Sequence, residues 1–76
     1  MSDVPHYTVI RGQFDCPWCD KAIAYLKDRG LPFDVQKLPM GELILRQAEV
    51  SHETVPLVFE GVTFIGGYDD LTRHVN

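Results

Sequence analysis

The fold of this chain is decided by residues 7–30, which read YTVIRGQFDCPWCDKAIAYLKDRG. The β-branched and aromatic residues at 7–10 favour a strand that ends just before Gly12. After Pro17, a residue suited to the first position of a helix, apolar residues recur at helical spacing and predict a helix of about three turns. Gly30 stands where a left-handed C-terminal cap is expected. The two cysteines therefore lie where the strand leads into the helix.

A second strand and a second helix follow this unit. Residues 33–36 alternate apolar with polar side chains, as a half-buried strand does. The second helix, which we expect to be amphipathic and to end near Val50, is marked by residues that recur at i, i+3, i+4 and i+7: Met40, Leu43, Ile44 and Gln47.

The remaining residues predict a hairpin and a short helix. Apolar runs at 56–59 and 62–65 flank a short turn that contains glycine, which is typical of an antiparallel hairpin. Asp69 or Asp70 can cap a final helix at 71–75. The chain ends directly after this helix.

The predicted order of elements is therefore β-α-β-α-β-β-α, which is an α/β fold. Because β-α-β crossovers are right-handed, we expect the first two strands to be parallel, with the first helix packed across one face of the sheet. The hairpin then completes a mixed four-stranded sheet. A chain of 76 residues has room for one compact domain, so we assign residues 1–76 to a single domain.

The composition is that of an ordinary globular protein. Hydrophobic residues make up 45% and charged residues 24% of the chain, and the formal net charge is −4. Nucleic acid is not an expected partner, because phosphate binding requires a basic face. No apolar stretch approaches the ~20 residues needed to span a bilayer, and Met1–Tyr7 lacks the apolar core of a signal peptide. We therefore expect a cytoplasmic protein without a membrane partner.

Both cysteines belong to one Cys-x-x-Cys sequence, Cys16-Pro17-Trp18-Cys19. Thiol exchange requires a thiolate, and the unpaired N–H groups and dipole at a helix N-terminus stabilise an anion. Cys16 occupies this position and is the predicted nucleophile. Cys19 lies one turn into the helix on the same face and is the predicted resolving thiol. We expect the sulfur of Cys16 to be exposed and that of Cys19 to be recessed.

Charged neighbours act on the Cys16 thiol in both directions. Arg11 and Lys21 favour the thiolate, whereas Asp15 and Asp20 oppose it. The helix N-terminus predicts that the pKa of this thiol is lowered, and the opposing charges leave the size of the shift open.

A zinc site and a structural disulfide are the other common uses of a Cys-x-x-Cys pair. Zinc usually needs about four ligands, and the three histidines, His6, His52 and His74, do not stand in pairs at finger-like spacing. A single disulfide that closes so short a loop constrains the unfolded chain weakly, and a reducing compartment disfavours it. We therefore predict no metal site and favour redox chemistry.

The chain resembles the glutaredoxin family over nearly its whole length. Three motifs carry the resemblance, in the family's order: Cys16-Pro17-Trp18-Cys19, Thr54-Val55-Pro56 and Gly66-Gly67-Tyr68-Asp69-Asp70-Leu71. The resemblance implies a thioredoxin-like fold in which Pro56 follows a cis peptide bond and faces the cysteines. The alternative is a trans Pro56 that merely begins an edge strand, because most X-Pro bonds are trans.

The resemblance also implies a binding site for glutathione. The backbone of Val55 would pair with the cysteinyl-glycine part, and N–H groups at the start of the last helix would bind the γ-glutamyl carboxylate. Those residues could also serve simply as a turn and a helix cap, and both interpretations can hold together. Trp18 would line the groove while remaining largely exposed. The implied binding residues are Trp18, Thr54, Val55, Pro56, Gly67, Tyr68 and Asp69.

Two features depart from the family pattern. The family usually carries a lysine shortly before the first cysteine, which pairs with the glycyl carboxylate of glutathione, whereas Gln13 stands three residues before Cys16 here. Arg11 or Gln13 would have to take its place. The chain also ends soon after the third motif, as in the compact glutaredoxins of bacteria and their viruses.

By this resemblance the chain is a glutathione-dependent oxidoreductase that reduces protein disulfides and glutathione mixed disulfides through Cys16 and Cys19. Glutathione would be a co-substrate, no cofactor would be tightly bound, and ribonucleotide reductase would be a natural substrate of the expected monomer. Two alternatives stay open. A hydrogen donor reduced by thioredoxin reductase would lack the acidic pair that follows Gly67 here. A glutaredoxin that holds an iron–sulfur cluster is opposed by the stiff Pro17 beside the ligand.

Overall fold

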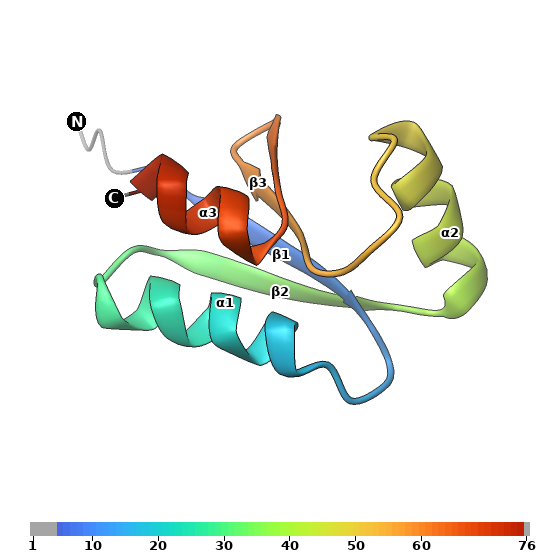
Figure 1. Ribbon diagram of the computed structural model, residues 1–76, viewed down its shortest axis with the longest axis horizontal. Helices are drawn as coiled ribbons and strands as arrows, with labels where there is room; N and C mark the ends of the chain where they lie inside the picture. The colour runs from blue at the N-terminus through green and yellow to red at the C-terminus, as the bar shows by residue number, and fades with distance from the viewer. Residues whose placement is uncertain (1–4, 76) are drawn as a thin grey trace.

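The structure, a computed structural model, describes residues 5–75 and contains the elements in the predicted order (Figure 1). Most of the Met1–Tyr7 segment, in which we expect no signal peptide, lies outside the described residues. Within residues 5–75, no helix is long and apolar enough to cross a membrane. In chain order the elements are β1 (Tyr7–Gly12), α1 (Pro17–Asp28), β2 (Phe33–Leu38), α2 (Met40–Glu49), β3 (Leu57–Glu60), β4 (Thr63–Gly66) and α3 (Tyr68–Val75).

The four strands form one mixed sheet in the order β2-β1-β3-β4. β1 runs parallel to β2, with Tyr7 opposite Phe33 and Gly12 opposite Leu38. This pairing is the one that a crossover through α1 allows. β3 runs antiparallel to both β1 and β4, so the predicted hairpin is confirmed. The α/β class and the mixed sheet are therefore as the sequence predicts.

Helices cover both faces of the sheet. Helices α1 and α3 lie side by side on one face of the sheet (Figure 1), and α2 lies on the opposite face. Together, α1 and α3 bury one cluster of side chains against β1 and β3: Tyr7, Val9, Ala22, Leu26, Val58 and Leu71. Beneath α2, Leu43 packs with Ile10 and Leu57. Because successive strand residues face opposite sides, Val9 and Ile10 belong to different clusters. The strand that leads to the cysteines is thus buried on both faces.

The first helix begins and ends where the sequence predicts. Pro17 is its first residue, and Gly30, just past its end, has a φ of 67°. The N–H of Gly30 donates to the carbonyl of Lys27 at 3.0 Å, which satisfies one of the carbonyls that a helix end leaves unpaired.

The last helix begins earlier than predicted, at Tyr68 rather than Leu71. The carbonyl of Gly67 accepts from the N–H of Leu71 at 3.0 Å, so Gly67 holds the N-cap position that was expected for Asp69 or Asp70. The carboxylate of Asp70 instead reaches back and accepts from the N–H of Gly67 at 3.2 Å. This is the acidic half of a capping box, which starts a helix three residues before the acid.

Two predicted apolar faces are less buried than expected. In α2 only Leu43 is buried, and Met40 and Ile44 are exposed, because this short helix lies near the ends of β1 and β2 (Figure 1) and one side of it extends past the sheet. In β2, Val35 is exposed although the alternating pattern predicts a half-buried strand. β2 is one of the two outer strands, and the buried strand residues of both core clusters come from β1 and β3.

The packing of the core predicts how much stability is lost when one buried side chain is shortened. Leu26 is fully buried between the sheet and α3, so Leu26→Ala should lower the free energy of unfolding by about 2–5 kcal/mol. Leu45 on α2 is 66% exposed, so Leu45→Ala should change it by less than about 0.5 kcal/mol. Urea unfolding of both variants measures the difference, and equal losses would contradict the described core.

Candidate active site

Cys16 and Cys19 form a disulfide at the start of α1. Cys16 is the N-cap of the helix, with an extended backbone, and its carbonyl accepts from the N–H of Asp20 at 3.0 Å. Its Sγ accepts from the N–H of Cys19 at 3.2 Å. A donor already directed at this sulfur would stabilise a thiolate formed there on reduction.

The two cysteine residues differ less in exposure than the sequence predicts for their sulfurs. Cys19 is 0% exposed, as predicted for a recessed thiol, but Cys16 is only 5% exposed and is buried too. The cause is the surrounding wall, because Phe14, Trp18 and Val55 line the same depression as Cys16. A substrate sulfur must therefore enter this depression to reach Cys16.

The loop before Cys16 is fixed by Arg11, which is buried at the end of β1. One guanidinium nitrogen lies 2.9 Å from a carboxylate oxygen of Asp20, and the other donates to the carbonyl of Phe14 at 2.9 Å. Arg11 thus joins the strand, the loop and the first turn of α1. Of the four charges expected near the thiol, these two compensate each other, and the ammonium of Lys21 lies 4.3 Å from the ring centre of Trp18.

The Val55–Pro56 peptide bond is cis, as the resemblance implies. Pro56 is buried directly before β3, and the hydroxyl of Thr54 lies 3.0 Å from Nε2 of His52. The second motif therefore forms a bent segment whose Thr54 and Val55 border the depression that contains Cys16.

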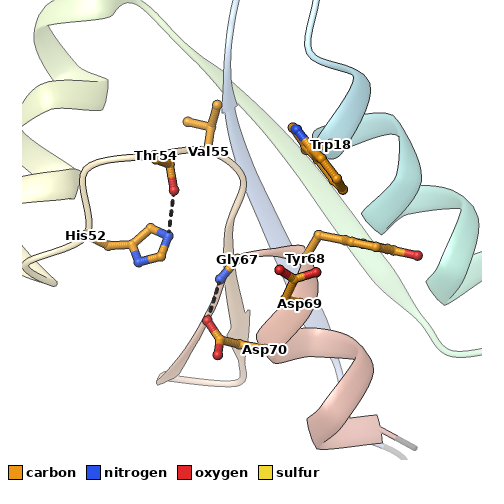
Figure 2. A pocket seen from close by; sticks show the side chains of 8 residues that line it. All are labelled: Trp18, His52, Thr54, Val55, Gly67, Tyr68, Asp69 and Asp70. Carbon is orange, nitrogen blue, oxygen red and sulfur yellow. Dashed lines mark hydrogen bonds between the residues drawn. The ribbon is translucent and has the colours of Figure 1, made fainter.

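A hollow of about 260 Å³ lies beside Trp18 and brings the three motifs together. Figure 2 shows Trp18 and Tyr68 on one side of it and His52 and Thr54 on the other, with the start of α3 between them. The rings of Trp18 and Tyr68 have centroids 5.9 Å apart. Trp18 remains 52% exposed, as expected. The lining residues are Trp18, His52, Thr54, Val55, Gly67, Tyr68, Asp69 and Asp70.

The start of α3 gives this hollow two kinds of polar group. The N–H of Gly67 is taken by Asp70, so the donors left for a ligand are the N–H groups of the first helical turn, from Tyr68 onward. The carboxylates of Asp69 and Asp70 lie beside them (Figure 2). An amino acid end group, with a carboxylate and an ammonium on one carbon, matches both kinds of group.

Two predicted binding residues lie elsewhere. Arg11 and Gln13 line a separate hollow with Lys37, and the guanidinium of Arg11 is engaged by Asp20 and Phe14. The geometry gives no support to the expectation that either one replaces the family's lysine.

On the sequence alone, His52 enters only as a candidate zinc ligand. Its ring contacts the edge of Phe64, with centroids 5.4 Å apart, and it lies at the wall of the hollow. Its place two residues before Thr54-Val55-Pro56 is the signal that could have identified it.

The histidines are spread over the molecule. Within residues 5–75, no three His, Cys, Asp or Glu side chains gather as a metal site would require. His6 pairs with Asp34, and His74 pairs with Glu60.

The sequence model of the family described as Glutaredoxin matches residues 7–65. The chain is 35% identical over 75 residues to glutaredoxin 3 of Escherichia coli K12, a match that covers 93% of this chain and 83% of that protein. It is 31% identical to a probable glutaredoxin of Acanthamoeba polyphaga mimivirus, covering 82% and 71% of the two chains.

Two further likenesses have a narrower meaning. A hybrid peroxiredoxin of Haemophilus influenzae is 43% identical over 60 residues, but the match spans 78% of this chain and only 25% of that protein. The crystal structure of glutaredoxin 1 from Francisella tularensis, complexed with cacodylate, superposes with a TM-score of 0.77. The superposed residues make up 93% of this chain and 92% of the Francisella chain. The sequences are 19% identical, so the comparison shows that the two proteins share the thioredoxin-like fold.

The contacts of Arg11 predict a structural effect. Arg11→Met removes its bonds to Asp20 and to the Phe14 carbonyl, so it should lower the free energy of unfolding by about 1–3 kcal/mol. Lys27→Met, an exposed change on α1, serves as the matched control and should have little effect. Thermal unfolding measures both, and an equally stable Arg11→Met protein would show that these bonds do not hold the loop.

Proposed function

The chain belongs to the glutaredoxin family and is a thiol-disulfide oxidoreductase, and we propose that glutathione is its reductant. The observation that carries the proposal is the hollow beside Trp18, whose walls offer donors and acceptors that match those of glutathione. It borders the depression with Cys16, because Trp18, Thr54 and Val55 line both. A tripeptide bound there would have its sulfur near that of Cys16.

The family resemblance implies where each part of glutathione lies in the hollow, and the polar groups there suit that arrangement. The backbone of Val55 pairs with the cysteinyl part, because an extended segment can add to a free backbone edge. The N–H groups of Tyr68 and Asp69, at the start of α3, bind the γ-glutamyl carboxylate. The carboxylates of Asp69 and Asp70 bind the γ-glutamyl ammonium, and Trp18 covers the peptide.

The proposed reaction passes through two mixed disulfides. The Cys16 thiolate attacks one sulfur of a protein disulfide, a new bond to that sulfur forms, and the other sulfur leaves as a thiolate. The Cys19 thiol, after losing its proton, attacks Sγ of Cys16 and releases the second protein thiol, which leaves the Cys16–Cys19 disulfide. One glutathione thiolate then opens this disulfide at Cys16, and a second removes the first as glutathione disulfide.

Reduction of a glutathione mixed disulfide needs fewer reaction steps. Cys16 attacks the glutathione sulfur, the substrate thiolate leaves, and a second glutathione regenerates Cys16. Cys19 takes no part in this route, so the two cysteines contribute differently to the two substrates.

The proposal extends to the setting of the reaction. We place the protein in the cytoplasm as a monomer, where reduced glutathione is available to it. Ribonucleotide reductase is a candidate protein substrate from the family resemblance. A peroxiredoxin is another, because a relative named a hybrid peroxiredoxin contains a matching segment in a quarter of its length.

Variants that lack one cysteine test the separate roles proposed for Cys16 and Cys19. Cys16→Ser should lose activity on every substrate, whereas Cys19→Ser should lose reduction of protein disulfides and keep activity on glutathionylated substrates. Turnover coupled to glutathione reductase measures both, and thermal unfolding checks that each variant is folded. Equal loss on glutathionylated substrates would give Cys19 a larger role. Turnover that is supported by thioredoxin reductase in the absence of glutathione would contradict the proposal that glutathione is the reductant.

His52 is the one lining side chain of the hollow that can carry a positive charge, and glutathione has a second carboxylate to bind. His52→Ala should therefore raise the KM for glutathione about three- to tenfold at unchanged kcat, and His52→Lys should retain a low KM. His6→Ala changes a histidine paired with Asp34 and is the control. Arg11→Met should leave the KM unchanged, and a rise there would restore Arg11 as a carboxylate ligand.

A further inference from the structure

A second depression, of about 490 Å³, contains Cys16 and shares Trp18, Thr54 and Val55 with the hollow proposed for glutathione, the glutathione hollow. We call it the Met40 groove, because Met40, the first residue of α2, is one of its lining residues. Its lining residues are Phe14, Asp15, Cys16, Pro17, Trp18, Met40, Leu43, Gln47, Glu53, Thr54 and Val55.

The walls of the Met40 groove expose large apolar side chains. Phe14 is 43% exposed and Met40 is 56% exposed, while Leu43 behind them is buried in the core. Phe14, Trp18 and Met40 come from separate parts of the chain and meet around the buried Cys16. An apolar patch with a polar rim marks a surface that contacts another molecule, and methionine adapts to partners of varied shape.

The charges of the Met40 groove have one sign. Its two charged lining residues are Asp15 and Glu53, and both are exposed. None of the lysines of residues 5–75 lines the groove: Lys37 lines the hollow with Arg11, and the ammonium of Lys21 lies 4.3 Å from the ring centre of Trp18. The two carboxylates favour a cationic group on a partner that enters this groove.

We propose that the Met40 groove binds the polypeptide side of the disulfide and selects extended segments with a large apolar residue and a Lys or Arg near the reacting cysteine. This rests on the proposed function. When Cys16 attacks the substrate sulfur and the partner sulfur leaves, the apolar side chain packs on Phe14 and Met40. The basic side chain pairs with Glu53 or Asp15. Glutathione takes the neighbouring hollow afterwards.

Synthetic disulfide-linked peptides test the selectivity. Three peptides of equal length carry beside the cysteine Leu and Lys, Leu and Glu, or Ser and Lys. The first should have a kcat/KM about two- to fivefold above the second, the effect of one partly exposed ion pair, and the advantage should shrink in high salt. It should exceed the third about fivefold through the apolar contact. Equal rates for all three would overturn the proposal.

Matched variants assign the selectivity to the groove. Met40→Gln should remove the preference for Leu over Ser, while Leu45→Gln, an exposed change on the same helix outside the groove, should retain it. Glu53→Gln should reduce the preference for Lys over Glu, while Glu42→Gln should not. Preferences unchanged in Met40→Gln and Glu53→Gln would overturn the proposal.

The mixed disulfide of glutathione with 2-mercaptoethanol separates the two proposals. The unchanged protein and the two controls, Leu45→Gln and Glu42→Gln, should turn it over at one rate, because neither residue lines the glutathione hollow or the groove. Normal turnover of this substrate without peptide selectivity would reject the groove and keep the proposed function. No turnover by the unchanged protein would reject both.

Discussion

The hydrogen bond from the N–H of Cys19 to Sγ of Cys16 is the interaction on which the active site depends. It makes one sulfur both the cap of α1 and the atom that we propose as the nucleophile, so the position of this atom is set by the start of the helix. The start of the helix is set in turn by Pro17 behind it and by Arg11, which binds the loop in front of it. The remaining motifs approach this fixed point from the opposite edge of β1 and from α3.

The fold could be predicted where local chemistry and tertiary packing agree. The buried β1, the Pro17 start and the Gly30 end of α1 are such places, because each residue type has one favourable role there. The sequence-based prediction was wrong where a contact with another part of the chain determines the start of a helix or the burial of a side chain. Asp70 starts α3 three residues early by bonding back to Gly67, and Val35 is exposed because β2 is an outer strand. Neither fact is contained in a local pattern.

The same division holds for the candidate site. The motif resemblance identified the lining residues Trp18, Val55 and Tyr68, because motif order is visible in sequence. It could not reveal that Cys16 is buried by side chains from other segments, or that Arg11 turns inward to Asp20. His52 reaches the hollow only through the course of the chain before the cis peptide bond. Its place at the wall of the hollow depends on the course of the chain in space, which the spacing between histidines in the sequence does not show.

The place of Trp18 has a consequence for studying this protein in solution. It is the one tryptophan of the sequence, and it lies between the two cysteines and against Tyr68 at the edge of the hollow. The intrinsic fluorescence of the molecule excited at long ultraviolet wavelengths therefore originates at the active site. Opening of the disulfide and binding of a molecule in either neighbouring depression both change the surroundings of the Trp18 ring. The fluorescence of the native protein therefore reports on both events without an added label.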